Sequence, residues 1–356
     1  MKNMSKICNV TLLLATLFIG CDSKERTQIA NVITFSGFKS ETDIKFDDFL
    51  KFEKGIARNL ILGNNSIVIV NSNAITDYVF YKYSLPSKTL DGRYIKGGRK
   101  FGQALGPMSN GVYNTIFWLH DVTKNKIITY RHTGDSALSV PKDSGNEYAF
   151  PTLYYSIQLL DSMKLLASGS FDSKSKLQVL DLVSGKKEGE FGSYLPNPKH
   201  IPFNSWKMAY QSFLFIKPKH DKAVLACRLT DRIEIFDLRS KKNIIIQGPE
   251  NFKPEFTPMR SGNMDLITRN EKSRFAFVNG LTTDRYIYLL YSGNLHNSPN
   301  LDYGKYVYIY DWEGNPIKKL NLDRYVSCIS IDRGNKTIYA FDVISKSIVK
   351  ANLSFN

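Results

Sequence analysis

The residue types that most often do chemistry are sparse in this chain and form no recognisable motif. No two of the five histidines have the spacing of metal ligands, and no cysteine cluster accompanies them. Gly-x-Ser-x-Gly elbows, phosphate-binding loops and paired dinucleotide-binding glycines are also missing. We therefore predict no metal site and no cofactor, and we name no catalytic residue. The histidines are His120, His132, His200, His220 and His296.

One cysteine, Cys21, lies in a context that predicts covalent modification. Two lysines precede an apolar run over residues 10–19, which suits the core of a secretion signal and is too short to span a bilayer. The run ends in Phe-Ile-Gly-Cys, which resembles the lipobox of bacterial lipoproteins, whose cysteine is lipidated. An ordinary secretion signal with an incidental cysteine is the alternative. We predict a lipoprotein signal peptide at 1–20, a polar tether at 21–28 and a single domain at 29–356.

The composition is basic, with 48 Lys and Arg against 33 Asp and Glu and a net charge of +15. An acidic glycan, lipopolysaccharide or nucleic acid would be a functional explanation. Solvated surface lysine is favoured, because many lysines occur in pairs at expected hairpin turns, where they discourage edge-to-edge aggregation. We expect no nucleic-acid partner. The pairs are Lys186 with Lys187, Lys241 with Lys242 and Lys318 with Lys319.

The elements that must position any site are β-hairpins that recur along the chain. Residues 306–320 alternate tyrosines with Val307 and Ile309 and then turn at Glu-Gly-Asn-Pro, the pattern of one hairpin. Related segments recur about every 50 residues, and no long stretch has helical spacing. Each copy places an Asp or Ser where it can accept hydrogen bonds from turn amides. These residues are Ser84, Asp121, Asp181, Asp237, Asp311 and Asp342, the last being the least regular copy.

This repeat length predicts an all-β fold, a six-bladed β-propeller of four-stranded antiparallel blades. Only three strands follow the hairpin at Asp311, so one strand of the last blade is missing from the C-terminal part. We expect an N-terminal strand, at residues 29–35, to supply it and close the ring. Cys227 and Cys328 lie in apolar runs and are expected to be buried free thiols.

The topology of such blades places alternate connections on opposite faces, and long loops on a rigid scaffold commonly bind partners. We expect the long segments at 97–110, 131–151, 193–211, 248–264 and 292–304 to share one face. Their aromatic, histidine and arginine side chains are candidates for contact with sugar rings or peptide side chains. Each could instead pack its own loop. The candidates are Tyr148, His200, Trp206, Arg260, His296 and Tyr303.

Residues 284–293, Asp-Arg-Tyr-Ile-Tyr-Leu-Leu-Tyr-Ser-Gly, together with the lipobox and the repeats, resemble the TolB-like six-bladed propeller lipoproteins of the Bacteroidetes. This resemblance implies the fold and a cell-surface setting and carries over no catalytic residue. The Pro-Asp-Gly motif of TolB itself is absent. Sites at Ser136 and Ser162 also match the O-glycosylation pattern of that phylum, in which Asp precedes Ser or Thr and an apolar residue follows.

These observations favour a non-catalytic binding protein, anchored to the bacterial outer membrane through Cys21, that recognises a glycan or protein partner with its long-loop face. We expect it to be a monomer. One alternative is a propeller enzyme, such as a lyase, lactonase or glycosidase, with acids and histidines at the channel mouth. Another is a structural subunit of an envelope complex, which predicts a large exposed apolar patch.

Overall fold

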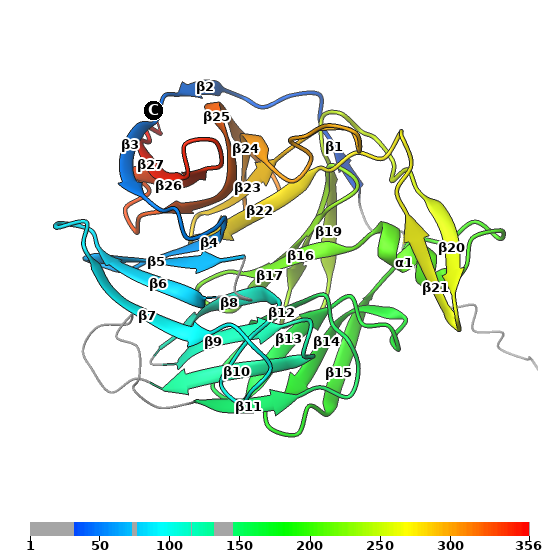
Figure 1. Ribbon diagram of the computed structural model, residues 1–356. Helices are drawn as coiled ribbons and strands as arrows, with labels where there is room; N and C mark the ends of the chain where they lie inside the picture. The colour runs from blue at the N-terminus through cyan, green and yellow to red at the C-terminus, as the bar shows by residue number, and fades with distance from the viewer. Residues whose placement is uncertain (1–31, 73–76, 115, 132–144, 356) are drawn as a thin grey trace, which may run out of the picture. The chain divides into compact units, whose positions relative to one another are not determined.

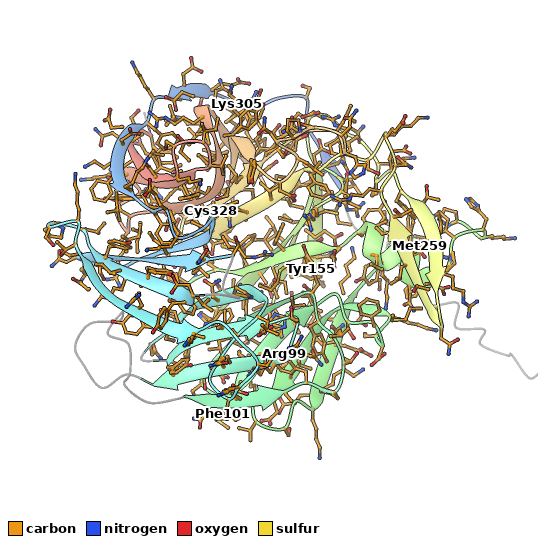
Figure 2. All side chains as sticks on the ribbon, viewed as in Figure 1. Arg99, Phe101, Tyr155, Met259, Lys305 and Cys328 are labelled. Carbon is orange, nitrogen blue, oxygen red and sulfur yellow. The ribbon has the colours of Figure 1, made fainter. Side chains whose placement is uncertain are left out.

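The computed structural model describes residues 32–72, 77–114, 116–131 and 145–355. The chain divides into two units, residues 1–30 and 31–356, and the described residues belong to the second. They form 27 strands and one short helix. Figure 1 shows how these elements are arranged, and Figure 2 adds their side chains. The predicted signal peptide and tether, with Cys21, lie outside the described residues.

Six groups of four antiparallel strands, here called blades 1 to 6, make up most of the second unit (Figure 1). Blade 1 contains β4 (Ala57–Leu62), β5 (Ser66–Asn71), β6 (Tyr78–Ser84) and β7 (Leu90–Lys96). Blade 2 contains β8 (Pro107–Tyr113), β9 (Ile116–Asp121), β10 (Lys126–Arg131) and β11 (Asn146–Ala149). Blade 3 contains β12 (Ser156–Leu159), β13 (Lys164–Ser168), β14 (Ser175–Asp181) and β15 (Lys187–Ser193). Blade 4 contains β16 (Ser212–Ile216), β17 (Lys222–Cys227), β18 (Arg232–Asp237) and β19 (Asn243–Gln247).

Blades 5 and 6 share one long strand, β25 (Pro316–Ile331). Its first part pairs with β24 and its last part with β26, so the two blades form one continuous sheet. Blade 5 also contains β22 (Phe277–Thr282), β23 (Tyr286–Tyr291) and β24 (Gly304–Asp311). Blade 6 also contains β26 (Thr337–Asp342), β27 (Ser347–Asn352) and β3 (Asp47–Lys51).

A belt of hydrogen bonds joins the innermost strand of every blade to that of the next blade. These strands are β4, β8, β12, β16, β22 and the last part of β25, and the belt returns from β25 to β4. Polar side chains in otherwise apolar inner strands therefore fix the blades to one another. The bonds are Asn59 Nδ2 to Asn110 Oδ1 (2.8 Å), Ser109 Oγ with Ser156 Oγ (3.1 Å), Gln158 Nε2 to Leu214 O (2.9 Å), Thr282 Oγ1 to Ile216 O (2.7 Å), Ile329 N to Asn279 Oδ1 (3.1 Å) and Ser327 Oγ to Ala57 O (2.6 Å).

The N-terminal part of the described chain runs along the outer edges of three successive blades. β1 (Val32–Thr34) pairs in parallel with β19 of blade 4, and β2 (Glu41–Ile44) in parallel with β25 in blade 5. β3 then pairs antiparallel with β27 as the outermost strand of blade 6. The expectation that residues 29–35 supply this strand is wrong, because residues 32–34 add a fifth strand to blade 4 instead.

The two faces of the ring carry different connections. The connections between second and third strands and those between blades emerge on one face, here called the long-loop face. The other connections emerge on the opposite face, here called the turn face. Four of the five long segments predicted to share a face do so. The fifth segment, 131–151, lies largely outside the described residues, but the ends of β10 and β11 that flank it are at the turn face, because these are the third and fourth strands of blade 2.

The recurring Asp and Ser residues accept hydrogen bonds from turn amides, as predicted. Asp237 Oδ1, for example, accepts from Ser240 N at 2.7 Å, and Asp311 Oδ1 from Asn315 N at 2.8 Å. Asp121 and Asp342, however, end the second strand of their blades rather than the third. A strand-ending Asp therefore marks a tight turn without fixing the position of its strand in the blade.

The tyrosine stripe of residues 306–310 forms part of β24, and Tyr308 and Tyr310 are buried in the packing between blades. Lys318 was expected to be solvated, but it is buried and its Nζ donates to the carbonyl of Ser354 at 2.9 Å. Cys227 and Cys328 are buried free thiols, as predicted, and burial raises their pKa to about 11 and about 12.

Candidate functional site

A central channel with a volume of about 700 Å³ runs between the six innermost strands. Its turn-face end is apolar, with Leu62, Val112, Ile216 and Ile331 in the lining. The side chains of the hydrogen-bonded belt make its middle polar. Because every inner strand runs from the long-loop face to the turn face, residues at the start of these strands meet at the long-loop end of the channel.

The long-loop end, here called the channel mouth, collects charged and polar side chains from blades that are distant in the sequence. Arg58 is the second residue of β4, Arg228 directly follows β17, and Asp302 and Tyr303 directly precede β24. The arrangement of the blades therefore brings to one place residues that no local pattern connects.

Arg58 has no carboxylate partner among the described residues. Its Nη2 lies 2.7 Å from Sδ of Met108, a weak acceptor, while its own carbonyl accepts from Asn279 Nδ2 at 3.2 Å. Burial lowers the pKa of Arg58, the charge of Arg228 acts in the same direction, and Tyr155 and Asp302 oppose it. Arginine nevertheless stays protonated in proteins, so Arg58 brings an unpaired positive charge to the mouth.

Arg228 forms the one ion pair at the mouth among the described residues. Its Nη2 donates to Asp302 Oδ1 at 2.7 Å, and its guanidinium stacks over the ring of Phe275 at 4.1 Å. The carboxylate is 59% exposed, whereas the arginine side chain is 30% exposed. Asp302 is therefore the accessible partner, and its Oδ2 accepts no hydrogen bond from the described residues.

Of the six residues proposed from the sequence, only Tyr303 lines the channel. Tyr148 belongs to β11, on the outside of blade 2, and packs against the core between blades. Trp206 lies in α1 (Phe203–Ala209), where its Nε1 donates to the carbonyl of Leu195 at 2.8 Å, so it packs its own loop.

The other three candidates lie elsewhere in the fold. Arg260 lies on β20 (Thr257–Ser261), which pairs with β21 (Met264–Thr268) in a projecting hairpin beside α1 (Figure 1). His200 is exposed just before α1, and His296 follows β23 with a buried Nδ1 that has no hydrogen-bond partner among the described residues. The structure therefore does not bring the six candidates together.

Arg58, Arg228 and Asp302 were not among the residues predicted from the sequence. One signal was available for Arg58, namely the adjacent polar pair Arg58 and Asn59 at the start of an otherwise apolar strand. Asp302 and Arg228 are 74 residues apart and carry no local signal of their pairing.

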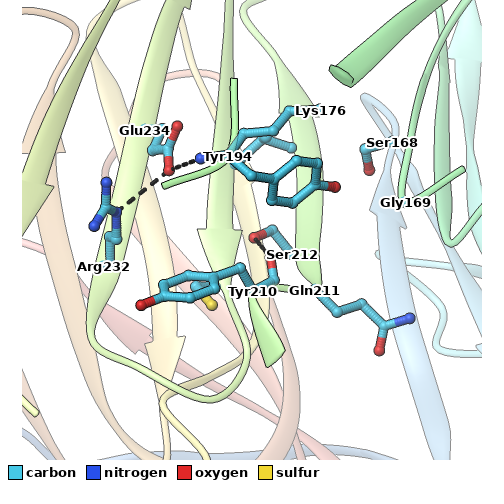
Figure 3. Close-up of a pocket in the computed structure, with 11 residues that line it drawn as sticks. Ser168, Gly169, Lys176, Tyr194, Tyr210, Gln211, Ser212, Arg232 and Glu234 are labelled. Carbon is cyan, nitrogen blue, oxygen red and sulfur yellow. Dashed lines mark hydrogen bonds and ion pairs between the residues drawn. The ribbon is translucent and has the colours of Figure 1, made fainter. Parts of the chain in front are cut away.

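A second, much smaller cavity of about 10 Å³ lies between blades 3 and 4, and Figure 3 shows its lining. Glu234 pairs with Lys176, and Glu234 Oε1 lies 3.3 Å from Arg232 Nε. All three side chains are at most 8% exposed. Burial lowers the pKa of Lys176, and Glu234 opposes this effect. This cluster has two cations and one anion. The cavity beside it is large enough for a water molecule but too small for an organic ligand.

Few groups at the mouth could perform acid–base chemistry. The described residues that line the channel include one carboxylate, Asp302, and no histidine. Across the described residues, no three His, Cys, Asp or Glu side chains form a group that could hold a metal ion. What the mouth does offer is a set of hydrogen-bond donors with an excess of positive charge.

Six four-stranded blades around a channel define a six-bladed β-propeller. A family model described as TolB-like 6-blade propeller-like matches residues 60–350, and the chain belongs to this family. The predicted resemblance to TolB-like six-bladed propellers is thus confirmed. Within the described residues no helix is long and apolar enough to cross a membrane.

Two solved structures illustrate how widely the fold is shared. A protein of Bacteroides fragilis described as exported is 11% identical, with a TM-score of 0.53 over 92% of this chain and 100% of that chain. Hydrazine synthase of Kuenenia stuttgartiensis is 9% identical, with a TM-score of 0.50 over 86% of this chain and 98% of that chain. No curated protein matches the sequence. These low identities show a common fold alone.

Proposed function

We propose that this protein is a lipid-anchored envelope protein that binds a glycan unit, without catalysis, at the mouth of its central channel. The observation that carries the proposal is the channel itself. Its volume of about 700 Å³ falls in the range of sites for small ligands rather than for folded partners. Its mouth opens on the face with the long loops, where Tyr303 offers an aromatic surface for a sugar ring.

A glycan array on the mature chain carrying Cys21→Ser tests the binding function. Two tyrosines provide a matched pair, because Tyr303 lines the mouth and Tyr148 lies on the outside of blade 2. Tyr303→Ala should weaken binding of any glycan that the array identifies, and Tyr148→Ala should leave it unchanged, with melting curves confirming that both variants fold. Equal binding by the two variants, or capture of proteins but of no glycan, would contradict the proposal.

The lipid anchor rests on the sequence around Cys21. Several acyl chains at one cysteine would hold the protein firmly, since each buried methylene contributes about 0.8 kcal/mol. Cys21→Ser should therefore release the protein from the membrane fraction into the soluble fraction and change its processing. Unchanged membrane association of this variant would rule out the anchor.

A further inference from the structure

The channel mouth has more positive than negative charge. Arg58 and Arg228 face it together with one carboxylate, Asp302, which is paired with Arg228. One positive charge therefore remains, and it belongs to Arg58, which has no ion-pair partner among the described residues. A charge held in a channel away from bulk water favours an anion that enters beside it.

The mouth also has donors that the protein leaves without acceptors. Arg58 Nη2 contacts only the thioether of Met108 among the described polar and sulfur atoms. Thioether sulfur is a weak acceptor, and the guanidinium carries five N–H donors. Arg58, which lines the channel, is therefore a suitable partner for a ligand that accepts hydrogen bonds.

We infer that the ligand bound at this mouth is an acidic sugar, whose carboxylate pairs with Arg58. This inference rests on the proposed function and adds the chemical class of the ligand. A carboxylate matches the fork of a guanidinium and carries the single negative charge that balances the mouth. A phosphate monoester carries nearly two charges at neutral pH and would exceed that balance.

The neighbouring groups suit the rest of a sugar. Asp302 Oδ2 accepts no bond from the described residues, and the carboxylate is 59% exposed, so it can accept from sugar hydroxyl groups. Tyr303 lies beside it in the lining and can stack on a pyranose ring. Arg58 then fixes the acidic end of the ligand, while Asp302 and Tyr303 bind its neutral part.

Calorimetric titration with sugars that differ only in the carboxylate tests the inference. The probes are glucuronate and galacturonate, compared with glucose and galactose, with glucose 6-phosphate as the phosphate arm. Measurements at fixed ionic strength are needed because the net charge of +15 attracts any anion. We expect at least one acid to bind about tenfold or more tighter than its neutral counterpart, the effect of a charge-assisted hydrogen bond.

Two variants and a control locate the effect. Arg58→Gln should remove the preference for the acid, and Arg58→Lys should restore part of it, because lysine keeps the charge but loses the fork. Arg239→Gln, an exposed arginine on the β18–β19 turn of the opposite face, should change nothing. Melting curves check that each variant is folded.

Several results would overturn the inference. If acids and neutral sugars bind equally well and Tyr303→Ala still abolishes binding, the site binds glycans but not through their charge, so the proposed function survives alone. Tighter binding of glucose 6-phosphate than of both acids would assign a phosphate ester instead. An acid preference that persists in Arg58→Gln would place the anion elsewhere, and a lack of binding by all five probes would count against both proposals.

Discussion

In the buried cluster between blades 3 and 4, removing the anion should destabilise the protein more than removing a cation (Figure 3). Among the described residues, Glu234 is the one carboxylate that pairs with both Lys176 and Arg232. Glu234→Gln removes the anion and leaves two buried cations together. Lys176→Met removes a cation and leaves Arg232 with Glu234, so the cluster becomes neutral.

The expected magnitudes follow from this charge balance. Removing one partner of a buried ion pair costs about 3–5 kcal/mol, because an uncompensated charge stays buried. Glu234→Gln should therefore lower the free energy of unfolding by about that amount. Lys176→Met leaves no uncompensated charge, because Arg232 Nε still lies 3.3 Å from Glu234 Oε1, so this variant should change stability by about 1 kcal/mol or less.

Urea unfolding of both variants, followed by far-ultraviolet circular dichroism, measures the difference. Glu188→Gln is the control, because Glu188 pairs with Lys164 on the exposed surface at 3.0 Å and should not shift the midpoint measurably. The reasoning would be refuted if Lys176→Met cost as much as Glu234→Gln, since the cluster would then not have an excess of positive charge.

Three further predictions concern groups elsewhere in the fold. His120 is fully buried, and burial lowers its pKa to about 4. In the unfolded chain the same imidazole takes up a proton near pH 6.5, so the free energy of unfolding should fall by roughly 3 kcal/mol as the pH drops from 6.5 to 4. Urea titrations across this range should show a weaker pH dependence in His120→Leu, and an unchanged profile would contradict this account. Burial raises the pKa of Tyr130 and Tyr210 to about 12, so the stability they contribute is complete below pH 10 and is lost as the pH rises towards 12; a melting temperature that stays constant between pH 10 and 12 would be inconsistent with it. Asn279→Leu leaves the amide of Ile329 and the carbonyl of Arg58 without their partner. It should lower the free energy of unfolding in urea by about 2–4 kcal/mol, and a decrease below about 1 kcal/mol would show that the belt bond at this junction is dispensable.

The repeat pattern predicted the fold because each blade repeats the same local chemistry. Alternating apolar residues and a strand-ending Asp are signals carried within a few residues of one another, as in β24 and its turn at Asp311. The strand β3 carries no such signal, since three of the five residues in its sequence, Asp-Asp-Phe-Leu-Lys, are charged and exposed. Its place beside β27 follows from the unpaired edge of blade 6 and from the packing of Phe49 and Leu50 against the core, which a five-residue pattern does not reveal.

The candidate site could be predicted only in part. Sequence reasoning placed four of the long segments on one face, and Tyr303 in one of these lines the channel mouth. Loop length could not show that β10 ends at the turn face, since that depends on whether β10 is the second or the third strand of its blade. Arg58 and Arg228 come from different blades and meet only because the ring brings their strands to one channel.

A crystal structure of the protein with the sugar that binds most tightly tests the central proposal most directly. We expect the ligand to occupy the long-loop end of the channel, with its carboxylate at Arg58 and its ring against Tyr303. A ligand bound on the outside of a blade, on the β20–β21 hairpin or at the turn face would contradict the proposal that the channel mouth is the binding site.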